Sequence, residues 1–134
     1  MMESFQIRRK FDASAETVYS AIEDTTIFKL TGADEISIDF NENGLFELIF
    51  QGRGKIYGSF EKISKTEIVL CWNVGGFDRQ DERETVVIFA LEKVGDTCNL
   101  ILTHSSIPSK ESAAAKMKAW SGVIDSLMDR LCVE

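Results

Sequence analysis

The sequence has few of the residues that are typical of metal and redox sites: one histidine and three cysteines among 134 residues. His104 alone cannot build a metal site from several imidazoles. The cysteines, at positions 71, 98 and 132, form no closely spaced pair typical of zinc or disulfide-exchange motifs. We therefore expect no metal and no cofactor, and reduced thiols as in a cytoplasmic protein.

Long hydrophobic runs and excess positive charge are also lacking. The start of the chain has no signal-peptide pattern, and no segment approaches the ~20 apolar residues of a membrane span. A net charge of −7 argues against nucleic acid as a partner, because phosphate backbones require clustered Lys and Arg. The length and the 44% hydrophobic content predict one globular domain over residues 1–134.

What is present is a change of hydrophobic period along the chain. Residues 4–11 are predicted as a strand, Ser14 as the cap of a helix over 15–24, and residues 26–31 as a second short helix ended by Gly32. From residue 34 to 106 the apolar residues alternate, which predicts six further strands. Turn sequences at 41–44, 51–54, 64–67 and 94–97 are short, so the strands should be antiparallel neighbours.

One connection is longer and charged, and we expect residues 73–84 to form a mobile loop. After Pro108, Ser109 is placed to cap a long terminal helix. Its apolar stripe recurs every three or four residues, at Ala113, Met117, Trp120, Ile124, Leu127 and Leu131. Gly122 is expected to let a neighbouring backbone approach. The predicted fold is α+β, in the order β-α-α-β6-α, with a curved antiparallel sheet wrapped around the terminal helix.

Four segments resemble the heat-shock-protein-90 ATPase activator homologue family, within the START-related (SRPBCC) helix-grip superfamily. They are FDASAETVYSAIED, GKIYGSFEKISKTEIVLCW, ETVVIFALEKVGDTCNLILTHSSIP and AWSGVIDSLMDRL, and the resemblance extends over nearly the whole chain. The resemblance implies a groove or cavity between sheet and terminal helix that accepts lipids, sterols, polyketides or similar apolar molecules. In eukaryotic members the domain instead helps to contact a chaperone.

Several residues are candidates for contact with an apolar ligand in such a cavity. They are Phe50, Tyr57, Trp72, Phe77, Met117 and Trp120. Each could equally be ordinary core packing. The resemblance favours Trp120 most, because it places this residue where helix and sheet diverge. His104 ends a strand, where it either touches a ligand or bonds a backbone neighbour.

Three functional hypotheses follow. The first is binding of a small apolar ligand without catalysis, with loop 73–84 as a gate. The second is a protein-interaction module with an acidic contact surface, resembling the chaperone activators. For both hypotheses we expect a monomer or a homodimer. The third is a cyclase- or hydrolase-like enzyme. It ranks last, since the carboxylates at 78–84 sit in a solvated segment without a partner to shift their pKa.

Overall fold

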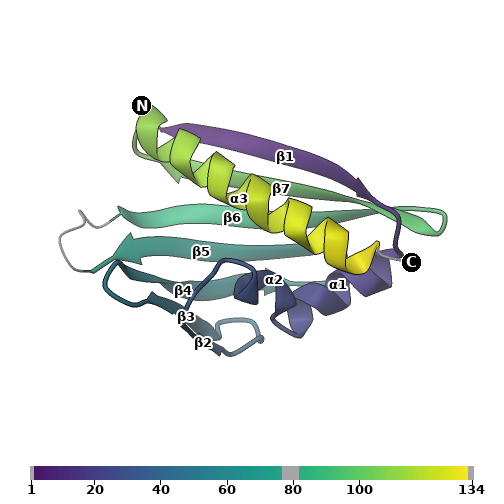
Figure 1. Cartoon of the computed structure of the whole chain (residues 1–134), viewed down its shortest axis with the longest axis horizontal. Helices are drawn as coiled ribbons and strands as arrows, with labels where there is room; N and C mark the ends of the chain where they lie inside the picture. Colours follow the sequence, from purple (N-terminus) through teal and green to yellow (C-terminus); the bar gives the residue numbers. More distant parts are fainter. Residues whose placement is uncertain (1, 77–81, 133–134) are drawn as a thin grey trace.

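The protein folds into one curved sheet around a long helix, described by a computed structural model for residues 2–76 and 82–132 (Figure 1). The seven antiparallel strands follow the order β1-β7-β6-β5-β4-β3-β2. The elements in chain order are β1 (Glu3–Phe11), α1 (Ala15–Glu23), α2 (Thr26–Lys29), β2 (Glu35–Ile38), β3 (Leu45–Phe50), β4 (Gly54–Ile63), β5 (Glu67–Gly75), β6 (Glu82–Val94), β7 (Thr97–Ile107) and α3 (Lys110–Leu131). The predicted α+β order is confirmed.

Both predicted helix caps are present. Ser14 Oγ accepts a hydrogen bond from the Thr17 amide at 3.1 Å, and Ser109 Oγ accepts one from the Ser112 amide at 3.1 Å. Each cap satisfies an amide that the first helical turn leaves without a partner. Among the described residues, no helix is long and apolar enough to cross a bilayer.

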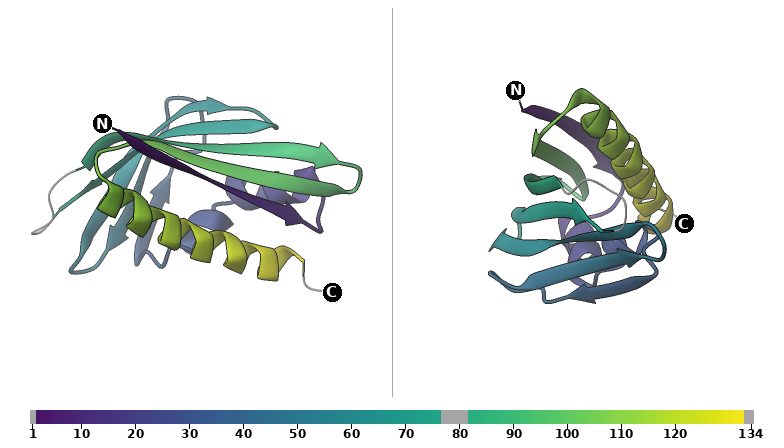
Figure 2. Two further views of the ribbon diagram at one scale, coloured as in Figure 1. Left: turned by 90° about the horizontal axis from the view of Figure 1, so that it is seen from above. Right: turned by 90° about the vertical axis from the view of Figure 1, so that its left-hand side faces the viewer.

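The sheet is strongly curved, and Figure 2 shows it wrapping around α3. Gly58 in the middle of β4 helps the strands to approach, because a Cβ there would lie only 1.9 Å from the Cys71 carbonyl oxygen. Any larger residue would push β4 and β5 apart. The buried apolar side chains of the strands belong to one core on the concave face, as the period-two pattern predicts.

The prediction of a loop over 73–84 is wrong at both ends. Strand β5 continues through Gly75 and β6 begins at Glu82. Asn73 is buried, and it holds this end of the sheet together: its Nδ2 donates to the Tyr57 carbonyl at 3.0 Å and its Oδ1 accepts from the Glu84 amide at 2.6 Å. Asparagine is a typical loop residue, but Asn73 fits inside a strand because both ends of its buried side-chain amide have hydrogen-bond partners. Residues 77–81 lie outside the described residues.

Helix α2 fills one part of the concave face. Phe28, which is 0% exposed, packs against Phe46, Phe60 and Phe89 with ring centroids 6.2, 6.3 and 6.5 Å away. These separations are typical of favourable aromatic contacts. Phe28 therefore joins α2 to the core of the sheet.

Candidate functional site

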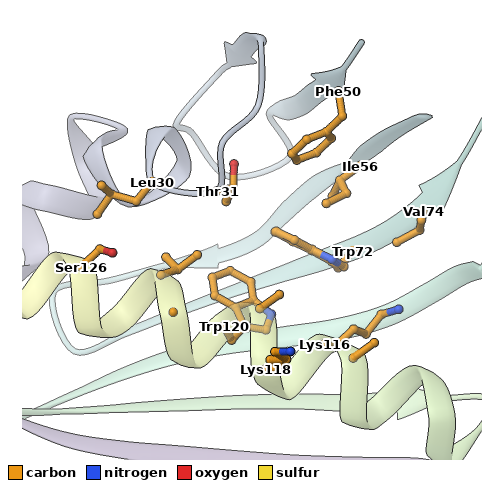
Figure 3. A pocket seen from close by; sticks show the side chains of 14 residues that line it. Leu30, Thr31, Phe50, Ile56, Trp72, Val74, Lys116, Lys118, Trp120 and Ser126 are labelled. Carbon is orange, nitrogen blue, oxygen red and sulfur yellow. The ribbon is translucent and has the colours of Figure 1, made fainter. Parts of the chain in front are cut away.

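A groove of about 690 Å³, partly open to solvent, lies between α3 and strands β3, β4 and β5 (Figure 3). Its volume falls within the ~300–1,000 Å³ of small-molecule sites. The described residues that line it are mainly apolar: Leu30, Thr31, Phe50, Ile56, Trp72, Val74, Ala115, Lys116, Lys118, Ala119, Trp120, Gly122, Val123 and Ser126. Such a surface favours an apolar molecule over a polar one.

The base of the groove is made by two tryptophans. The rings of Trp72 on β5 and Trp120 on α3 have centroids 4.9 Å apart and planes inclined by 47°, and each residue is 4% exposed. Val74 and Ile56 extend this surface along β5 and β4, because they share the concave face with Trp72. Phe50 completes the sheet side at the end of β3.

The helix side of the groove is lined by small side chains. Ala115, Ala119, Gly122 and Ser126 follow one another at spacings of four, three and four residues, so they share one face of α3. A Cβ built on Gly122 would meet nothing within 4 Å. The expectation that Gly122 admits a neighbouring backbone is therefore wrong, since the space beside it belongs to the groove.

Burial along α3 changes abruptly at Trp120. None of residues 110–119 is buried, whereas Trp120, Val123, Ile124 and Leu127 are. Met117 continues the predicted apolar stripe but is 44% exposed and does not line the groove. The structure therefore does not place Met117 at the groove, in contrast to the prediction. The apolar stripe of α3 is buried only from Trp120 onward.

Tyr57 also lies away from the groove. Its neighbour Ile56 points into the groove, so Tyr57 points to the opposite, outer face of β4. There the Lys55 ammonium lies 5.2 Å from the Tyr57 ring centroid and 3.4 Å from Glu47. Phe77, the remaining aromatic candidate, lies outside the described residues.

His104 is fully buried behind Trp120 and does not line the groove. Trp120 Nε1 donates to His104 Nδ1 at 3.1 Å, and an indole nitrogen can only donate. The neutral imidazole therefore carries its proton on Nε2, which donates to Thr85 Oγ1 at 2.9 Å. The Thr85 hydroxyl in turn donates to the Trp72 carbonyl oxygen. We call these four groups, from Trp120 to Trp72, the relay.

The relay satisfies the polar atoms behind the groove and holds the Trp120 indole in one orientation. His104 at 0% exposure and Thr85 at 0% are surrounded by the core of β6 and β7. Because buried polar groups are costly without partners, the indole cannot rotate away without leaving His104 Nδ1 lacking this donor. Trp120 therefore has both an apolar face toward the groove and a polar anchor behind it.

Several lining residues were not named from the sequence. Ile56 and Val74 could have been found, because they alternate in phase with Phe60 and Trp72 along their strands. Leu30 and Thr31 follow α2, and Val123 lies three residues after Trp120; only the tertiary arrangement brings them to the groove. Among the described residues, no cluster of His, Cys, Asp and Glu could hold a metal ion.

Solved structures with the same fold are similar along almost the whole chain. The Mll3558 protein from Rhizobium loti has 20% identity and a TM-score of 0.82, with 98% of each chain covered. PFC0360w, an HSP90 activator from Plasmodium falciparum, has 22% identity and a TM-score of 0.75, with 94% of this chain and 93% of that chain covered. The Aha1 dimer from Colwellia psychrerythraea has 22% identity and a TM-score of 0.78, with 98% of this chain and 97% of that chain covered.

These identities show the fold and carry no residue roles. No curated protein sequence matches the chain. A family model, described as Activator of Hsp90 ATPase homolog 1-like protein, matches residues 12–131 and so includes both tryptophans, the relay and every described residue that lines the groove. The chain belongs to this family, as the four sequence segments and the helix-grip fold indicate.

Proposed function

We propose that the protein binds a small apolar molecule in the groove between α3 and the sheet, without catalysing a reaction. The observation that carries the proposal is the groove itself: about 690 Å³ of space with Trp72, Trp120 and Phe50 on its surface. The half-buried apolar side chains around the two buried tryptophans, such as Phe50 and Ile56, are favourable to cover with an apolar ligand. Phe50, Trp72 and Trp120 are the proposed ligand contacts.

The position of the tryptophans makes binding directly measurable. The chain has two tryptophans, and both line the groove. A ligand in the groove would therefore change the intrinsic fluorescence of both indoles, and a ligand elsewhere would change it much less. The experiment titrates the protein with dodecanol, a sterol and a polycyclic aromatic ketone, and follows tryptophan fluorescence together with the melting temperature. We expect at least one of these probes to quench the fluorescence and raise the melting temperature.

A groove-filling variant supplies the control. Ala119→Leu places a larger side chain into the groove and should weaken binding at least about tenfold, because the added side chain occupies the ligand's space. Ala114→Leu makes the same change on an exposed part of α3 that does not line the groove, and it should bind as the original protein does. Equal affinity in both variants, or no response to any probe, would contradict the proposal.

The absence of a catalytic role is supported by the position of His104. It is the single histidine of the sequence, and both its ring nitrogens engage the relay instead of facing the groove. A general base must reach the proton that it removes, and Trp120 stands between this imidazole and the groove. If His104→Ala abolished a measured turnover while the protein stayed folded, the cyclase- or hydrolase-like hypothesis would replace this one.

A second candidate function is interaction with a chaperone, which is favoured by the family to which the chain belongs and by its net charge of −7. The measurement is the ATP turnover of an Hsp90-type chaperone with and without the protein, at low and high salt. We expect any stimulation to fall at high salt, because charged interfaces are screened there. The free thiols of Cys71, Cys98 and Cys132 agree with a cytoplasmic location for either function.

A further inference from the structure

The charges that line the groove differ from those of the chain as a whole. The sequence has 22 acidic and 15 basic residues, but the charged residues among the described groove lining are two lysines, Lys116 and Lys118. No carboxylate of the described residues lines it. In a chain with excess negative charge, the charged side chains of the described groove lining are therefore of the opposite sign.

The two lysines lie on either side of the small-residue face of α3. At about 100° per residue, Lys116 and Lys118 project to opposite sides of Ala119, which itself faces the groove. Lysine side chains cover apolar surface with their methylene groups while the ammonium group reaches water. The Lys116 ammonium donates to Ser112 Oγ at 2.8 Å, so this ammonium group lies toward the first turn of α3.

A third cation, which does not itself line the groove, lies next to a lining residue of the sheet side. The Arg53 guanidinium carbon lies 5.3 Å from the ring centroid of Phe50, and Phe50 lines the sheet side of the groove. Cations from both α3 and the β3–β4 turn are therefore next to lining residues. The base of the groove, in contrast, is formed by the rings of Trp72 and Trp120. Apolar surface at the base and positive charge at the sides form an amphipathic site.

We infer that the ligand of this groove is an amphipathic organic anion, with an apolar body on the two tryptophans and one carboxylate or sulfonate group beside Lys116 and Lys118. This inference rests on the proposed function and adds the charge of the ligand to it. The acid group pairs with ammonium groups at the rim, where both remain partly hydrated and the cost of desolvation is small. A neutral molecule of the same shape covers the same apolar surface but lacks these pairs.

The test uses two dyes that differ by one acid group. 8-Anilinonaphthalene-1-sulfonate carries a negative charge, and N-phenyl-1-naphthylamine is its neutral counterpart. We expect the sulfonate to bind about tenfold more tightly, as two exposed ion pairs together allow. We also expect its advantage to fall as the ionic strength rises from about 0.01 M to about 1 M, because the Debye length shortens from ~30 Å to ~3 Å. Dodecanoate and dodecanol repeat the comparison with an alkyl chain.

Matched variants assign the effect to the groove. The double substitution Lys116→Gln, Lys118→Gln should remove the preference for the anion, because it weakens binding of the sulfonate about tenfold more than binding of the neutral dye. The control Lys10→Gln, Lys110→Gln changes the net charge equally at exposed sites that do not line the groove, and it should keep the preference. Equal binding of both dyes by the original protein overturns the inference about charge but supports the proposed function, whereas binding of neither dye overturns both.

Discussion

Two parts of the same concave sheet are used in opposite ways. Under α2, the ring of Phe28 meets Phe46, Phe60 and Phe89, and no space is left. Beside the middle of α3, Phe50, Trp72 and Ile56 face a groove of about 690 Å³. The residue types on the sheet are alike in both parts. The difference lies in the covering helix: α2 places the Phe28 ring against the sheet, whereas α3 presents small side chains on both sides of Trp120.

The largest loss of stability should come from a substitution in the part of the sheet that Phe28 fills. Phe28→Ala removes a fully buried ring and should reduce the free energy of unfolding by about 3–5 kcal/mol. Phe50→Ala removes the same ring from a partly exposed position and should cost less than about 2 kcal/mol. Urea unfolding followed by circular dichroism measures both. Similar losses would show that the two parts of the sheet do not differ as described.

A smaller effect should follow from breaking the relay. Trp120→Phe keeps an aromatic ring but removes the indole N–H that donates to His104, so about 1–3 kcal/mol of stability should be lost. Trp72→Phe is the matched control, because Trp72 joins the relay through its backbone carbonyl, which the substitution retains. The two losses are compared by chemical unfolding at neutral pH. If Trp72→Phe proved as destabilising as Trp120→Phe, ring volume and not the hydrogen bond would explain the loss.

The smallest effect has the opposite sign. Gly122→Ala should stabilise the protein by about 0.5–1 kcal/mol, because alanine is the better helix former and the new Cβ meets nothing within 4 Å. Thermal unfolding should show a melting temperature raised by a few degrees. Gly58→Ala, in contrast, should destabilise the protein, since its Cβ would lie 1.9 Å from the Cys71 carbonyl oxygen. A loss of stability on Gly122→Ala would mean that the groove is closed there.

Local patterns predicted the fold well. Alternation along the strands, the short turns, and the serine caps at Ser14 and Ser109 depend on residues close together in sequence, and the structure contains them all. Consistent use of the same alternation would also have excluded Tyr57 from the groove, since Ile56 faces it. The mistake at Tyr57 came from giving an aromatic residue type more weight than its position in the strand.

The remaining features depend on contacts that sequence periodicity does not contain. Met117 has the correct spacing for the buried face of α3, but burial depends on where the sheet covers the helix. The relay joins Thr85, His104 and Trp120, which come from three separate elements. Asn73 looks like a loop residue until its two partners on β4 and β6 are known. Long-range contacts of this kind determine which face of a helix or strand becomes a site.

The direction of the hydrogen bonds in the relay has a consequence for the proposed binding of an apolar ligand. Every group from Trp120 to the Trp72 carbonyl has a fixed donor and acceptor role, so the Trp120 ring cannot flip to suit a differently shaped ligand without breaking a buried bond. A rigid wall of this kind discriminates by shape, and it spends little conformational entropy when a ligand arrives. The groove should therefore be selective among molecules of similar hydrophobicity, and a wider range of ligands should become acceptable once the indole is released from His104.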